Sequence, residues 1–376
     1  MRVYEYKDME ECTVITGRAH DIDDLYRWFT KLIPECEEEK HPMEIEREKR
    51  LAERRARQNE RMLADANNGI YETIVPRDYK LSTSNDYGTI SKEIIIVCGG
   101  VCLGTKGDQE HTNEVLSKIN SLFELNGSYL VFVRSSQDDA SLFNENRIEM
   151  SHIRTVEDYS VLKTKYYSVL CLGGSVSFDK NWKIKMGEFL KRKMYWENEG
   201  FNYNEALIDE VIKEHKIGLV VSDTCPTFTF PGMNSTLSRV INDPKGEVLA
   251  SINSERKAMD NIYNKMISSD NRPYMWVYTK FDVYERNFIN DIAFQSMSSG
   301  TLSSFGEFLD EFDLSYEDVQ NGKTILFDDK ESGRKKKRRK VQSSRLVAAE
   351  PIPLDAQRDR LFHFVDINNN AIEVGH

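Results

Sequence analysis

Residues 94–104 read IIIVCGGVCLG, an apolar run followed by a glycine-rich turn. The apolar part, residues 94–98, has the length and continuous apolar character of a strand. Residues 113–125 follow and are expected to form a helix, because their apolar side chains recur at helical spacing. Those side chains are Val115, Leu116, Ile119, Leu122 and Phe123. A strand, a turn and an amphipathic helix in this order indicate an α/β protein.

The same alternation extends along the chain on both sides of this unit. Further strands are expected at residues 12–16, 129–133, 169–172, 218–222 and 274–278, and further helices at residues 22–33, 203–216 and 254–268. Strands that alternate with helices predict sheets covered by helices rather than an all-helical or all-strand domain.

Composition excludes several classes of protein. The chain has 376 residues, 39% of them hydrophobic, which is enough for one large core or two smaller ones. The net charge of −11 argues against general affinity for nucleic acid or an anionic membrane. We expect no membrane span, since no apolar run reaches 18 residues, and no secretory signal in the charged residues 1–11. The 6 scattered cysteines suit a reducing, cytoplasmic compartment.

Two charged segments interrupt the alternation. The first, within residues 35–90, is densest at residues 35–66 and lacks an apolar stripe wide enough for a core helix. It predicts a solvated helical insertion in a domain of residues 1–325, with a protein-binding arm as the alternative.

The second charged segment lies in residues 326–376, which are expected to form a basic linker and C-terminal extension with a strand-like stretch at 361–367. Seven consecutive cations mark it: Arg334, Lys335, Lys336, Lys337, Arg338, Arg339 and Lys340. Such a block repels itself and predicts an exposed loop. Two interpretations remain open, a nuclear-localisation or nucleic-acid patch and a solvated loop without a partner.

Two segments between the predicted strands resemble those of a known family. Residues 172–180 read LGGSVSFDK, similar to a G-G-x-x-S-x-D-[KR] pattern, and residues 195–199 read YWENE, similar to W-W-x-x-E. Over roughly residues 10–310, the order of segments resembles the calcineurin-like metallophosphoesterases of bacterial or phage type. The resemblance implies a four-layer α/β/β/α sandwich with two metal ions, held by motifs at the strand ends.

Most of the family's metal-binding positions are changed in this chain. In the first motif, Arg18 stands where the ligand Asp belongs, His20 matches the family His, and Asp21 replaces a Gly. In the second motif, Gly100 replaces the Asp that would bridge the two metals. A two-metal site is not expected to survive the loss of its bridging carboxylate.

The third and fourth motifs are altered as well. Ser136 replaces the ligand Asn, and Gln137 replaces the His that would protonate the leaving group. Asp138 matches the family Asp, while Asp223 replaces a ligand His in the fourth motif. The catalytic positions implied by the resemblance are therefore His20, Gln137 and Asp138, in a degraded form.

In the fifth motif, Lys280 and Asp282 stand where two His are expected. Arg18 and Lys280 thus bring cations to the metal positions, and the nearby aspartates Asp138, Asp223 and Asp282 are expected to surround them, because unpaired buried charges are costly. This pattern favours a catalytically inactive pseudo-phosphoesterase, natural or inactivated, that acts through binding and needs no cofactor.

An active enzyme is the alternative hypothesis. His20, Asp223 and Asp282 form an oxygen-rich set that suits one hard cation such as Mn²⁺ or Mg²⁺. Lys280 or Arg18 would then hold the phosphate of an ester, although both also compete with a cation for the same carboxylates. Under either hypothesis, Arg18, Gly100, Ser136, Asp223 and Lys280 are expected to line one crevice.

Overall fold

The structure, a computed structural model, describes most of the first 325 residues. The described residues are 1–17, 22–33, 90, 92–104, 109–191, 193–229, 243, 245–281, 283–298 and 301–325. The expected insertion, the basic block and the strand-like residues 361–367 lie outside this part of the chain, so these remain predictions.

The smaller of two sheets has five strands in the order β12-β2-β3-β4-β5. Their bounds are Leu302–Ser304 (β12), Glu11–Thr16 (β2), Glu93–Cys98 (β3), Tyr129–Val133 (β4) and Ile153–Val156 (β5). Strands β2 to β5 are parallel, and β12 pairs antiparallel with β2. The strand read from residues 94–98 therefore lies at the centre of this sheet.

The larger sheet has seven strands in the order β1-β6-β7-β8-β9-β11-β10. Their bounds are Val3–Glu5 (β1), Ser160–Lys163 (β6), Ser168–Leu172 (β7), Ile217–Ser222 (β8), Met275–Tyr278 (β9), Ile292–Ser296 (β11) and Glu285–Ile289 (β10). The pairs β7–β8, β8–β9 and β9–β11 are parallel, whereas β6–β7 and β10–β11 are antiparallel.

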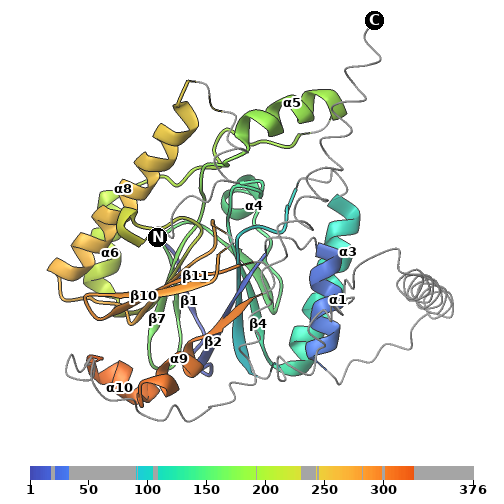
Figure 1. The fold of residues 1–376 in the computed structure, drawn as a ribbon. Coiled ribbons are helices and arrows are strands. Elements are labelled where there is room, and N and C mark those ends of the chain that lie inside the picture. The colour runs from blue at the N-terminus through green and yellow to red at the C-terminus, as the bar shows by residue number, and fades with distance from the viewer. Residues whose placement is uncertain are drawn as a thin grey trace, which may run out of the picture.

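Helices cover the outer face of each sheet (Figure 1). Helices α1 (Ile22–Leu32) and α3 (Gln109–Asn126) lie on the smaller sheet, and α6 (Glu205–Glu214) and α8 (Glu247–Ser268) lie on the larger one. The remaining helical elements are α4 (Ser141–Asn144), α5 (Lys180–Leu190), η3 (Thr227–Thr229), α9 (Phe305–Glu311) and α10 (Tyr316–Asn321). Among the described residues, none of the helices is long and apolar enough to cross a membrane.

The alternation of side chains along the strands defines the layers. On β3, Ile94 and Ile96 point into a core shared with the larger sheet, while Ile95 and Val97 pack against α1 and α3. On β8, Val221 belongs to the shared core and Val220 packs under the other pair of helices. Because successive side chains on a strand point to opposite faces, this arrangement gives the layer order α/β/β/α. The expected fold class is confirmed.

The strands and helices expected within the described residues are all present, with shifted ends. Helix α8 begins at Glu247 rather than at residue 254, and β4 has the bounds read from the sequence. Six strands were not expected: β1, β5, β6, β10, β11 and β12. Most of these are short or carry polar residues, such as Arg154 in β5 and Arg286 in β10, so no apolar run identifies them.

Candidate functional site

The altered motif positions lie where the carboxyl ends of the two sheets meet. Gly100 follows β3, Ser136 follows β4, Asp223 follows β8 and Lys280 follows β9. The Ser136 backbone N–H donates to Asp223 Oδ2 at 3.4 Å, and the Lys280 N–H donates to the Asp223 carbonyl at 2.9 Å. These residues of the expected crevice form one cluster, and Ser136, Asp223 and Lys280 are at most 6% exposed, so the crevice is closed in this structure. Arg18, His20, Asp21 and Asp282 lie outside the described residues.

Asp223 is the centre of this cluster and is fully buried. Its Oδ2 accepts a hydrogen bond from the Ser175 hydroxyl, and its Oδ1 accepts one from the Thr279 hydroxyl at 2.8 Å. Ser175 belongs to the loop after β7, and Thr279 directly follows β9. Both carboxylate oxygens of Asp223 are therefore engaged by hydroxyl groups of the protein itself.

Lys280 has a partner that the sequence did not indicate. Its ammonium forms an ion pair with Glu255 of α8, and the two side chains are only 1% and 3% exposed. The other carboxylate oxygen of Glu255 accepts a hydrogen bond from the Val176 N–H at 2.7 Å. Burial raises the pKa of Glu255, although the adjacent Lys280 opposes that shift. The described aspartates do not surround Lys280 as expected: its carboxylate partner is Glu255.

Asp138 lies in a buried turn after β4. It accepts hydrogen bonds from the Leu103 N–H, the Ser135 N–H and the Ser135 hydroxyl, each at 3.0 Å. Burial raises the pKa of Asp138 from 3.8 to about 6, and those hydrogen bonds limit the rise. Gln137, next to it, accepts a hydrogen bond from the Cys102 thiol at 3.6 Å. Asp138 thus fixes the turn that carries Ser136 and Gln137.

Gly100 occupies a position that strongly favours glycine. Its φ is +77°, in the left-handed region, and a Cβ added there would overlap the Ser135 hydroxyl. That hydroxyl is held by its hydrogen bond to Asp138, so it cannot easily move aside. The bridging Asp of the resembled family therefore cannot be placed at position 100 without rearranging the turn after β4.

The two segments that carry the family resemblance contact each other. The Ser177 hydroxyl and N–H donate to the two carboxylate oxygens of Glu199 at 2.6 and 2.7 Å. Lys183, at the start of α5, donates to the same hydroxyl at 2.7 Å and reaches the Ser136 carbonyl at 3.5 Å. Burial raises the pKa of Glu199. This network connects α5 to the turn that holds Ser136.

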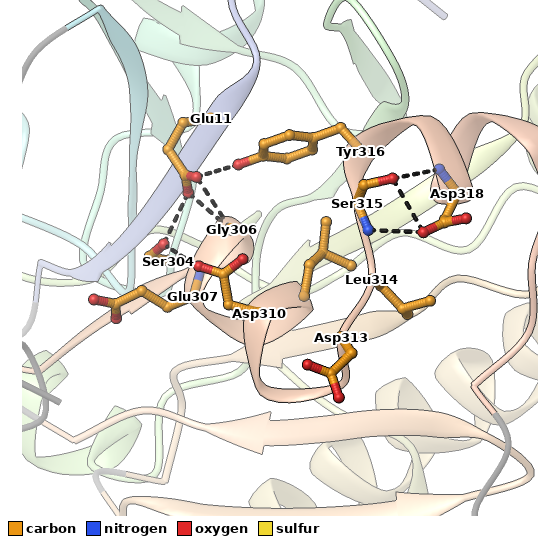
Figure 2. Close-up of a pocket in the computed structure, with 11 residues that line it drawn as sticks. Glu11, Ser304, Gly306, Glu307, Asp310, Asp313, Leu314, Ser315, Tyr316 and Asp318 are labelled. Carbon is orange, nitrogen blue, oxygen red and sulfur yellow. Dashed lines mark hydrogen bonds between the residues drawn. The ribbon is translucent and has the colours of Figure 1, made fainter. Parts of the chain in front are cut away.

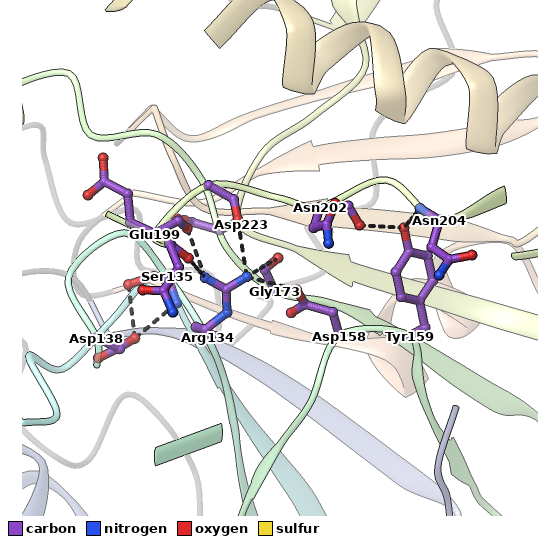
Figure 3. Close-up of polar contacts among 12 residues, drawn as sticks. Arg134, Ser135, Asp138, Asp158, Tyr159, Gly173, Glu199, Asn202, Asn204 and Asp223 are labelled. Carbon is purple, nitrogen blue, oxygen red and sulfur yellow. Dashed lines mark hydrogen bonds and ion pairs between the residues drawn. The ribbon is translucent and has the colours of Figure 1, made fainter. Parts of the chain in front are cut away.

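Another buried cation, Arg134, supports the same turn (Figure 3). Its guanidinium forms an ion pair with Asp158 at 2.7 Å and donates to the carbonyls of Asn198 and Glu199, both at 2.9 Å. Arg134 was not among the site residues predicted from the sequence. Its partners come from distant segments, so no local pattern indicated this role.

The described part of the crevice does not fit a two-metal centre. No group of three or more His, Cys, Asp or Glu lies close enough to hold a metal within the residues that the structure describes. Lys280 contacts Asp223 through its backbone N–H and places its buried ammonium against Glu255, and a side chain at Gly100 would overlap Ser135. The single-cation alternative depends on His20 and Asp282, which lie outside those residues.

Figure 2 shows a large open cavity that none of the motif residues lines. It has a volume of about 850 Å³ and is lined mainly by α9, α10 and the start of β2. Its lining includes five acidic residues: Glu11, Glu307, Asp310, Asp313 and Asp318. Glu11 is engaged within the protein, since it accepts hydrogen bonds from Ser304 and Tyr316. Neither Asp223 nor Lys280 lines this cavity.

Comparisons with known proteins give distant structural likeness alone. No family model matches the chain, and no curated protein matches it. Among solved structures, a phosphopantetheinyl hydrolase from Mycobacterium tuberculosis is similar at a TM-score of 0.30 and 9% sequence identity, over 57% of this chain and 82% of the other. A likeness at this level carries no inference about activity. What is established is a mixed α/β sandwich of two helix-covered sheets.

Proposed function

We propose that this chain is a calcineurin-like metallophosphoesterase-type protein that lacks metal-dependent hydrolysis and acts through binding. The observation that carries the proposal is the buried ion pair of Lys280 and Glu255, next to Asp223. The Lys280 ammonium already neutralises Glu255, so this carboxylate is not available to a divalent cation, and replacing the ammonium by a metal would break a buried ion pair. The protein's own ion pair thus satisfies a buried carboxylate without a metal.

The surroundings of the pair support the same proposal. The hydroxyls of Ser175 and Thr279 hold Asp223, so metal binding at this carboxylate would break hydrogen bonds already made. Gln137 has an amide where the resembled family has its proton donor, and an amide is not a general acid. Losing a positioned general acid typically lowers the rate by about 10²–10⁴.

The test combines metal analysis with a hydrolysis assay. The full chain is purified, its metal content is measured by elemental analysis, and hydrolysis of bis(4-nitrophenyl) phosphate is followed with Mn²⁺, Mg²⁺ or Zn²⁺ added. We expect metal far below one ion per chain and no turnover above the protein-free background.

Two variants and one control separate the alternatives. Metal-dependent turnover that disappears in Asp223→Ala and in Asp282→Ala, but persists in the exposed control Asp310→Ala, would overturn the proposal and establish the single-cation enzyme. Circular dichroism of each variant shows whether lost turnover reflects the site or the fold. Turnover that persists in both site variants would point to a contaminating phosphatase.

A further inference from the structure

Helix α5 and the residues after it carry a charge opposite to that of the whole protein. Residues 180–193 contain six Lys or Arg and one Glu, a local charge of +5 in a chain of net charge −11. Lys183 is buried in the network with Ser177, whereas Lys185, Lys191 and Lys193 are exposed. An exposed cationic segment on an acidic protein favours a polyanionic partner.

Exposed apolar side chains accompany these cations. Phe189 is 68% exposed and Ile184 is 37% exposed, so both lie at the surface of α5. Along the helix, Lys185 and Lys191 are six residues apart, about 9 Å. Cations that alternate with an exposed aromatic ring are the arrangement by which proteins hold single-stranded nucleic acid, the lysines on phosphates and the ring on a base.

The distribution of the apolar residues argues against a lipid surface. Ile184 and Phe189 are five residues apart, which places them about 140° apart around the helix axis. The charged Lys185 and Glu188 lie between them on the exposed side. An interfacial helix needs one continuous apolar face, and α5 has none.

We propose that α5 and its C-terminal flank, defined by Lys185, Phe189, Lys191 and Lys193, form a binding surface for single-stranded nucleic acid. The surface lies beside the crevice, because Lys183 on the same helix reaches the Ser136 carbonyl. Figure 1 shows α5 at one end of the molecule, beyond both sheets. Binding here does not depend on whether the crevice hydrolyses esters, so it stands apart from the loss of catalysis proposed above.

The test is a fluorescence anisotropy titration of a labelled dT20 oligonucleotide with the full chain. The basic block at 334–340 is a separate candidate for nucleic-acid binding, so all variants are made in a background in which its seven cations are replaced by Gln. In that background we expect binding at low salt. The slope of log affinity against log salt should be about −2, because three lysines each neutralise one phosphate of a single strand.

The variants separate the charge of this surface from the net charge of the protein. The first variant replaces the three lysines of this surface together, Lys185→Gln, Lys191→Gln and Lys193→Gln, and should remove most of the dependence of the affinity on salt. The control variant replaces three exposed lysines elsewhere in the chain, Lys7→Gln, Lys118→Gln and Lys213→Gln, and should leave that salt dependence unchanged. Phe189→Ala should weaken binding about 5- to 150-fold through lost stacking.

Three results would overturn the proposal. The first is that dT20 does not bind at low salt in the Gln background. The second is that the two triple-lysine variants lose equal affinity for dT20. The third is that the protein binds phosphatidylserine vesicles but not dT20. Circular dichroism confirms that each variant is folded, so that lost binding reports on the surface.

Discussion

Lys280 and Glu255 form an ion pair that is almost completely shielded from water, with side chains 1% and 3% exposed. The lysine follows β9 at the end of the larger sheet, and the glutamate comes from α8 on its outer face. Phe178 covers the pair, since its ring centroid lies 5.2 Å from the Lys280 ammonium. The pair therefore links α8 to the residues that follow β9.

Glu255→Gln should destabilise the fold strongly. The substitution leaves the Lys280 ammonium without a carboxylate in a buried site, and removing one partner of a buried pair typically costs about 3–5 kcal/mol. The measurement is the free energy of unfolding in urea. Lys280→Met with Glu255→Leu should recover much of this loss, since it removes both charges.

An exposed pair provides the control for that measurement. Lys118 and Glu114 lie one turn apart on α3, with side chains 48% and 63% exposed. Glu114→Gln should change the free energy of unfolding far less than Glu255→Gln does, because water screens the exposed pair. Equal losses for Glu114→Gln and Glu255→Gln would show that the buried pair has no special role.

Gly100→Ala should destabilise the protein more than Gly246→Ala. Both glycines have positive φ, +77° and +72°, so both substitutions carry a backbone cost of about 1–2 kcal/mol. At Gly246 a Cβ meets nothing within 4 Å, whereas at Gly100 it overlaps the Ser135 hydroxyl. The free energy of unfolding in urea is measured for both variants, and the difference between their losses gives the cost of this overlap. Similar losses of stability would mean that the turn after β4 shifts to make room for the Cβ, and that an Asp at position 100 is sterically possible.

The elements predicted from the sequence are those with a strong apolar signal. Residues 94–98 are apolar throughout because the central strand β3 is covered on both faces. Strands β10 and β12 lie at sheet edges, where one side has no neighbouring strand and burial is incomplete or the strand is short. Such strands lack an apolar run, so periodicity does not reveal them.

The crevice was predicted in position but not in its contacts. The motif order placed Gly100, Ser136, Asp223 and Lys280 at strand ends, and the structure brings those ends together. The partner of Lys280 could not be read from the sequence, because Glu255 lies in the middle of a helix with several charged residues, and the spacing does not show which of them are buried; Arg256, next to it, is buried as well. Only the packing of α8 on the larger sheet turns that one carboxylate inward.

Glu199→Gln should destabilise the network that links the two connecting segments. The carboxylate accepts two hydrogen bonds from Ser177, and its negative charge offsets the buried positive charge of Lys183. Its loss should therefore lower the free energy of unfolding by about 1.5–3 kcal/mol. The neighbouring Glu197 is exposed, and Glu197→Gln should change the unfolding free energy by less than about 0.5 kcal/mol. A Glu199 variant as stable as the Glu197 variant would contradict a structural role for the network.

Asp138 should make the stability of the protein fall as pH rises from about 4 to about 7. Burial raises the pKa of this carboxyl from 3.8 to about 6, so the folded state holds a proton that the unfolded state has already released. Its contribution is complete below pH 3.8 and is lost as pH rises through about 6. A shift of this size corresponds to about 3 kcal/mol.

The measurement is urea unfolding of wild type and Asp138→Asn across this pH range, because asparagine does not titrate. Glu199 and Glu255 shift in the same direction, and the difference between the two proteins removes their contribution. Asp138→Asn should gain stability relative to wild type as pH rises from about 4, and the gain should level off above about 6. Ser135→Ala should move the pH at which the gain levels off to a higher value, since the serine hydroxyl donates to the ionised carboxylate. A difference that stays constant with pH, or that changes in the opposite direction, would show that Asp138 is ionised throughout in the folded protein.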